Sequence, residues 1–152
     1  MPIIGGSGGG GSGAGTEINY TQITAPVNIT DTAENTATAL ISPGAITFDG
    51  GPVMVEFFAV VQSDTNALGD NVIISLFEGA TQITRLAVQR AEIITSADLH
   101  TMVGRYRFTP TAGSHTYKLT AFVPNTGGTP QLVAGNGCTN GNPPAFIRFT
   151  KV

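Results

Sequence analysis

The stretch Val53–Gln62 reads VMVEFFAVVQ, and it decides the fold. In an extended strand, successive side chains point to opposite faces. Here the odd-numbered positions are all apolar, and the even-numbered positions carry Met, Phe and Val, with only Glu56 and Gln62 polar. A strand that is apolar on both faces is either central in its sheet or directed at a partner subunit.

Similar short runs continue on both sides of this strand, divided by turn residues such as Asp49-Gly50-Gly51-Pro52. We expect strands at 23–29, 36–41, 45–48, 53–62, 72–77, 81–89, 100–109, 114–123, 131–134 and 145–152, whereas 91–99 is ambiguous. There is no amphipathic helix of normal length. The sequence therefore predicts an all-β fold, a two-sheet antiparallel β-sandwich or jelly roll.

Two of these strands alternate clearly enough to assign faces. The first should place Tyr106 and Phe108 on one face and Arg105 and Arg107 on the other. The second, SHTYKLTAFV, should direct Tyr117, Leu119, Ala121 and Val123 inward and Thr116, Lys118 and Thr120 outward.

The first fifteen residues, MPIIGGSGGGGSGAG, differ from the rest of the chain. From Gly5 onward no side chain in this run can build a core, and Gly/Ser runs are usually flexible. We expect residues 1–17 to form an N-terminal arm and residues 18–152 to form one jelly-roll domain. The apolar tip, Met1, Pro2, Ile3 and Ile4, is a candidate hook for a neighbouring protein, although a cloning remnant is an alternative origin for the arm.

Charges are few and unevenly placed. Charged residues make up 11% of 152 residues and the net charge is −3, so we expect no nucleic-acid partner. Eight acids and no base precede Arg85, and seven bases with two acids follow from Arg85 onward. One interpretation is that early and late strands pair in a sheet and neutralise each other. The other is that opposite charges meet between identical subunits.

The sequence offers little chemistry. It has no nucleophile elbow, and Ser114 and His115 are adjacent on a strand, so their side chains should point to opposite faces. His100 and His115 are not at metal-ligand spacing, and the oxygen-rich loop around Asp64 and Asp70 lacks the closing Glu of a calcium loop. We therefore expect no enzyme activity, no metal and no cofactor.

Compartment signals are also sparse. Cys138 is the single cysteine, which excludes an internal disulfide. No signal peptide and no membrane-spanning apolar run are recognisable, so we expect synthesis in a cytoplasm and no membrane partner.

Three segments together resemble a known group of proteins: ITFDGGPVMVEFF (46–58), TPTAGSHTYKLTAF (109–122) and AFIRFTKV (145–152). The middle segment is similar to the Gly-x-His-x-Tyr-x-Leu strand of complement-type and tumour-necrosis-factor-like jelly rolls. The whole set resembles small virion proteins of tailed bacteriophages, of the head-decoration or minor-tail type. The resemblance implies a homotrimer on the surface of a virus particle, and it carries over no functional residue.

These observations favour a non-enzymatic structural protein of a bacteriophage virion, made in the host cytoplasm. Its trimeric head would be anchored by the arm to a major capsid or tail protein, most simply as a capsid decoration or cement protein, because the chain has no fibre shaft. The alternative is a minor tail or tail-fibre protein that binds a host receptor or glycan. Candidate subunit-interface residues are Phe57, Phe58, Phe146 and Phe149.

Overall fold

The computed structural model describes residues 13–62, 71–90, 99–124, 130–135 and 141–152. Within these ranges strands dominate, and the single helical element is a short 3-10 turn, η1 (Glu34–Thr36). The strands are β1 (Glu17–Ile23), β2 (Val27–Asn28), β3 (Thr38–Ile41), β4 (Ile46–Asp49), β5 (Val53–Gln62), β6 (Asn71–Glu78), β7 (Thr81–Arg90), β8 (Leu99–Phe108), β9 (Ala112–His115), β10 (Tyr117–Phe122), β11 (Gln131–Leu132) and β12 (Ala145–Lys151). The predicted all-β class is confirmed.

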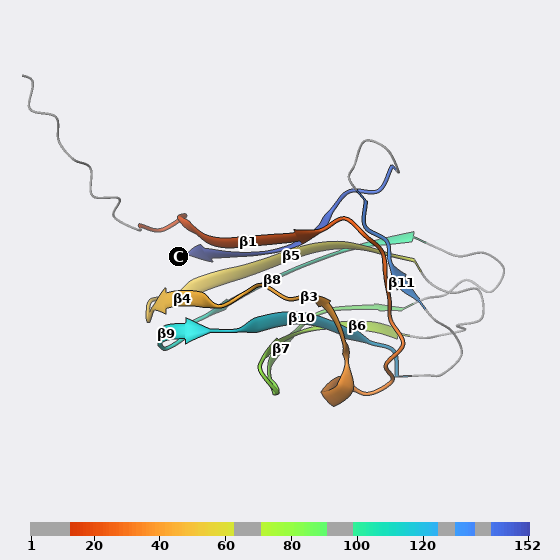
Figure 1. The fold of residues 1–152 in the computed structure, drawn as a ribbon, viewed down its shortest axis with the longest axis horizontal. Helices are drawn as coiled ribbons and strands as arrows, with labels where there is room; N and C mark the ends of the chain where they lie inside the picture. The colour runs from red at the N-terminus through yellow and green to blue at the C-terminus, as the bar shows by residue number, and fades with distance from the viewer. Residues whose placement is uncertain (1–12, 63–70, 91–98, 125–129, 136–140) are drawn as a thin grey trace, which may run out of the picture.

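The long strands form two antiparallel sheets that pack face to face (Figure 1). Sheet A has the order β1-β12-β5-β8, with β11 and β2 continuing beside β5, and sheet B has the order β3-β10-β6-β7. The pairs β1·β12, β3·β10, β5·β8 and β6·β7 show that the chain is folded back on itself like one long hairpin and then rolled up. This wrapping is the jelly roll that the sequence predicts.

Strand β5 lies inside sheet A, between β12 and β8. Its odd-numbered side chains point to the interior, where Val55 and Phe57 are fully buried, as are Ile74 and Leu119 on the facing strands of sheet B. Tyr117, Phe48 and Phe149 add an aromatic cluster to this core, in which Phe48 meets both other rings edge to face. The two-sided apolar pattern of VMVEFFAVVQ is therefore explained in part by a central position.

Several sequence expectations need correction. The run 114–123 is two strands, because β9 ends at His115 and β10 begins at Tyr117. Thr120, expected to face solvent, is buried and donates a hydrogen bond to the carbonyl of Ser75 at 3.3 Å. The first strand starts at Glu17 and not at residue 23. Most of the ambiguous segment, residues 91–98, lies outside the described residues.

The two sheets come into close contact where β8 passes β7. A Cβ atom on Gly104 would lie 2.7 Å from the carbonyl oxygen of Leu86 on β7, and it would also overlap the ring of Phe57. Neither neighbour is the free end of a flexible chain, so only a glycine fits here. This contact closes one side of the sandwich.

We predict that Gly104→Ala lowers the free energy of unfolding by about 2 kcal/mol or more, because the added methyl group forces the two sheets apart. Urea denaturation followed by circular dichroism measures the change. The matched control is Gly44→Ala, where a new Cβ has no atom within 4 Å. Equal stability of the two variants would show that the β7–β8 contact is looser than described.

Candidate functional site

Ion pairs join the two halves of the chain. The guanidinium of Arg85 donates to the carboxylate of Glu34 at 2.7 Å. Glu56 pairs with two bases, Arg105 at 2.6 Å and Arg148. Lys151 pairs with Asp49. Each acid comes from before Arg85 and each base from Arg85 onward. The rolled hairpin brings early strands beside late strands, so the interpretation that the charges neutralise within one chain is confirmed for these pairs.

Glu56 is the centre of the largest pair cluster. Its carboxylate lies on β5 between Arg148 on β12 and Arg105 on β8, and it accepts hydrogen bonds from both guanidinium groups. Its side chain is largely shielded from solvent. Hydrogen bonds from Arg148 and then Arg105 hold the pKa of Glu56 below its ordinary value, and burial opposes them. The cluster fixes the register of three adjacent strands.

We predict that Glu56→Gln lowers the free energy of unfolding by about 1 kcal/mol near neutral pH, since two guanidinium groups lose their charged acceptor. The pKa of Glu56 is lower in the folded than in the unfolded chain, so its stabilisation is complete above the ordinary value of 4.5. It is lost as the pH falls through the lowered folded value. Denaturation curves of both proteins across this range should converge in acid. A difference that persists unchanged in acid would contradict the assignment.

The outer face of sheet B is covered by its own polar side chains. Phe77 and Phe122 are buried there, with the ammonium of Lys118 5.6 Å from the centre of the first ring and the guanidinium of Arg85 5.9 Å from that of the second. From η1, Glu34 reaches over the sheet to accept a hydrogen bond from Arg85. The aromatic rings of this face are thus covered, and Val88 on β7, which is 57% exposed, is the large hydrophobic side chain that stays exposed on it among the described residues.

The outer face of sheet A is organised differently, in rows that run across the four strands. The register of β1, β12, β5 and β8 places residues side by side, in that order of strands. We call them the end row (Glu17, Thr150, Met54, Arg107), the charged row (Tyr20, Arg148, Glu56, Arg105) and the apolar row (Gln22, Phe146, Phe58, Val103).

The apolar row is uncovered. Val103 is 65% exposed, and Phe58 and Phe146 stand partly exposed with nearly parallel rings whose centres are 6.0 Å apart. Tyr20, which is 43% exposed, packs on Phe146 from the neighbouring strand. These four residues form an apolar stripe across the whole sheet, which is the clearest feature of the described surface that the fold itself does not use.

The structure corrects two of the four interface residues expected from the sequence. Phe57 and Phe149 are 0% exposed and belong to the interior of the sandwich, so their side chains have no surface to offer another subunit. Phe58 and Phe146 lie on the outer face and stay candidates. Tyr20 is not among the residues predicted from the sequence, because the first strand was expected to begin only at residue 23. Val103 is not among them either, although alternation along its strand places it on the same face as Arg105 and Arg107.

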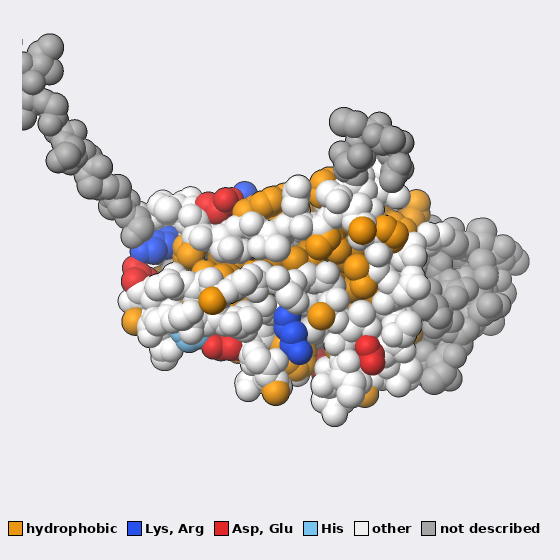
Figure 2. All heavy atoms as spheres, in the orientation of Figure 1, with side chains coloured by type: hydrophobic (Ala, Val, Ile, Leu, Met, Phe, Trp, Pro, Cys, Tyr) orange, Lys and Arg blue, Asp and Glu red, His pale blue; other side chains and the backbone are white. Residues whose placement is uncertain are grey.

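Two hollows flank this face. One, of about 290 Å³, is lined by Glu56, Val103, Gly104 and Arg105. The other, of about 300 Å³, lies at the open side of the sandwich between β1 and β4 and is lined by Thr16, Glu17, Ile18, Thr47, Phe48, Asp49 and Lys151. Figure 2 shows hydrophobic side chains along this open side, between β1 above and β3 and β4 below.

The titratable groups near His115 are used structurally. Its Nδ1 contacts Glu78 and its Nε2 contacts the carbonyl of Thr111, and the hydrogen bond to Glu78 raises the pKa of His115. Burial raises the pKa of the neighbouring Tyr117 to about 12, so this phenol stays protonated. Ser114 directly precedes His115 on β9, and adjacent strand residues point to opposite faces, as the sequence predicts for this pair.

Other chemistry predicted to be absent is not tested by the structure. Among the described residues there is no group of three or more metal-binding side chains. Asp64 and Asp70 fall outside them, as does Cys138. None of the helical segments in the described ranges is long and apolar enough to cross a membrane.

The arm joins the domain beside the C-terminal strand. Gly15 donates its backbone N–H to the carbonyl of Lys151 at 2.7 Å, and Lys151 donates to the carbonyl of Thr16 at 2.9 Å. Figure 1 shows this junction and the C-terminus at the same end of the sandwich as β4 and β9. The tip residues Met1, Pro2, Ile3 and Ile4 lie outside the described residues.

No protein-family model and no curated protein matches the chain. Similar solved structures include the C-terminal domain of the sugar-binding protein EclA, with 17% identity and a TM-score of 0.40, covering 72% of this chain and 74% of that chain. A carbohydrate-binding module of Cellvibrio mixtus lichenase 5A in complex with cellotriose has 14% identity and a TM-score of 0.34, covering 91% and 92%. The infectious bursal disease virus VP2 subviral particle has 12% identity and a TM-score of 0.44, covering 99% of this chain and 41% of VP2. At these scores the likenesses assign no function.

Proposed function

We propose that this chain is a non-enzymatic structural protein of a bacteriophage virion, a homotrimeric head on the particle surface that its N-terminal arm anchors. A capsid decoration or cement role fits best. The observation that carries the proposal is the use of the side chains: most charged groups of the described residues form ion pairs with other described residues, whereas the apolar stripe of sheet A is exposed.

The arm supplies the anchor in this proposal. Its glycine-rich part lets the backbone lie flat against another protein, and its apolar tip, Met1 to Ile4, buries surface in a capsid or tail subunit. Apolar burial contributes about 25 cal/mol per Å² and is opposed by the entropy of ordering the arm. The root of the arm is held to β12 by backbone hydrogen bonds, so a pull on the tip is transmitted to sheet A.

We predict that a variant lacking residues 1–12 folds and assembles like the full chain but no longer binds particles. The deletion keeps the hydrogen bond from Gly15 to Lys151, so the sandwich should not lose stability. Co-sedimentation with particles stripped of this protein measures binding. A full-length control, Ile3→Asp with Ile4→Asp, keeps the glycine run and should also fail to bind. Undiminished binding of the truncated chain would refute the anchor.

A tail protein that binds a host glycan or receptor is the second candidate. The hollow lined by Glu56, Val103 and Arg105 favours this candidate, because it combines a carboxylate and a guanidinium with exposed apolar surface. Tyr20 lies in the same row as Glu56 and Arg105. Such a mixture of apolar surface with a few polar groups is typical of small-ligand sites.

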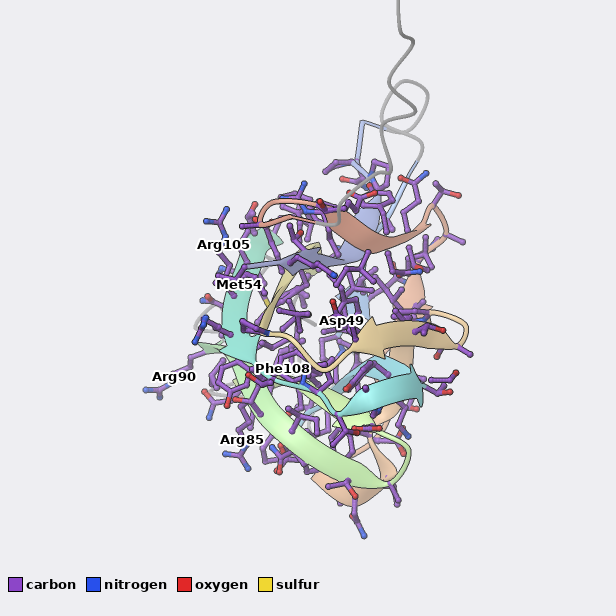
Figure 3. The ribbon with its side chains drawn as sticks, turned by 90° about the vertical axis from the view of Figure 1, so that its left-hand side faces the viewer. Asp49, Met54, Arg85, Arg90, Arg105 and Phe108 are labelled. Carbon is purple, nitrogen blue, oxygen red and sulfur yellow. The ribbon has the colours of Figure 1, made fainter. Side chains whose placement is uncertain are left out.

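For this candidate we predict a hit on a glycan array that Tyr20→Ala and Arg105→Ala both abolish. The matched control is Arg90→Ala on β7, since Arg90 also points outward but belongs to sheet B (Figure 3). An array without hits, or hits that survive both substitutions, leaves the structural role as the proposed function.

A further inference from the structure

We propose that the outer face of sheet A is the surface through which copies of this chain contact one another, around an axis that runs parallel to the strands. This proposal rests on the proposed function in one respect, namely that copies of the chain assemble with one another. The face, the axis and one charge pair between subunits fix the arrangement.

The rows make this face complementary to itself. Rotation about an axis parallel to the strands keeps each row at its own height, so the apolar row of one copy meets the apolar rows of the others. The same rotation places the β1 edge of one copy beside the β8 edge of the next. Apolar contact therefore needs no shift of register between subunits.

The two edges carry opposite charges at one height. The end row has Glu17 at the β1 edge and Arg107 at the β8 edge, and both are exposed. Within the described ranges neither residue lies at ion-pair distance from an opposite charge of its own chain, although the charge of Glu17 acts on Arg148, whereas Glu34, Asp49 and Glu56 all form ion pairs. Glu17 of one copy thus meets Arg107 of the next, which fixes the register and disfavours a reversed arrangement.

The charged row holds its single carboxylate within its own chain. Glu56 already accepts hydrogen bonds from Arg105 and Arg148, so its carboxylate is not left without a partner when the face is covered. The side chain of Arg105 is 70% exposed, and Figure 3 shows it at the outside of the molecule, on the side where Met54 lies. Because one Glu56 carboxylate serves both Arg105 and Arg148, the row keeps one excess positive charge, and Arg105 brings part of it near Arg107 at the β8 edge.

The available area suits a specific contact. Two strands of ten residues and two of seven, spaced about 4.8 Å apart and rising about 3.3 Å per residue, give a face of roughly 540 Å². Specific interfaces bury about 800 Å² per partner, and side chains add to the flat area of a sheet. The outer face of sheet B is a poorer candidate because Lys118 and Arg85 cover its aromatic rings.

The first experiment compares two exposed valines on opposite sheets. Val103→Lys places a charge in the apolar row, whereas Val88→Lys changes a valine that is 57% exposed on β7. By sedimentation velocity and light scattering, the wild type and Val88→Lys should be oligomers, and Val103→Lys should dissociate with an association constant lowered about tenfold or more. A monomeric wild type, or equal behaviour of both variants, overturns the inference.

The second experiment exchanges the edge charges. Glu17→Arg and Arg107→Glu should each weaken assembly, because like charges then meet between subunits. The double variant, Glu17→Arg with Arg107→Glu, should restore it, since the pair is re-formed with the signs reversed. Both residues are exposed, so the fold should survive. A double variant as weak as the single ones overturns the edge pairing.

Mixing the two single variants separates this inference from the proposed trimer. In a two-fold dimer, both contacts of a mixed pair join opposite charges, and assembly recovers fully. In a ring of three, at least one contact always joins two copies of the same variant, and recovery is partial. Full recovery refutes the trimer but supports the interface, whereas partial recovery supports both. An absence of any recovery overturns the edge pairing.

Discussion

The antiparallel pairing between the first and second halves of the chain is the constraint on which the rest of the structure depends. It places β12 between β1 and β5, and β10 between β3 and β6, so each sheet is built from both halves. The same pairing explains the uneven charges of the sequence. Acids of the early strands meet bases of the late strands, and Glu56 bridges two such bases at the middle of sheet A.

The two sheets treat their outer faces in different ways. Sheet B covers Phe77 and Phe122 with cationic side chains of its own, helped by Glu34 from η1. Sheet A joins Glu56 to Arg105 and Arg148 within one row and leaves the next row apolar and open. Covering the apolar row removes exposed apolar surface from water, and this burial favours contact with another protein surface.

Much of the fold could be predicted from the sequence, because strands and turns are encoded locally. The alternation of VMVEFFAVVQ gives both faces of β5 correctly, and the late position of the bases anticipates the pairs with Glu34, Asp49 and Glu56. The split between β9 and β10 could not be predicted, since it depends on a change of partner strand, from β4 for β9 to β3 and β6 for β10. The burial of Thr120 could not be predicted either, since it depends on what covers the outer face of sheet B. Phe57 and Phe58 look alike in the sequence because β5 is apolar on both faces, and only the packing of the two sheets shows that Phe57 fills the core and Phe58 faces outward.

The position of β12 also constrains how the molecule is made. Glu17 pairs with Thr150, so the first long strand waits for a partner that the ribosome delivers much later. Until residues 145–151 emerge from the exit tunnel, β1 and β5 both present an unpaired edge where β12 belongs. Nascent chains of this protein therefore expose two strand edges whose backbone groups are unpaired and can pair with other chains. Sheet A is complete only when β12 has been synthesised and has inserted between β1 and β5.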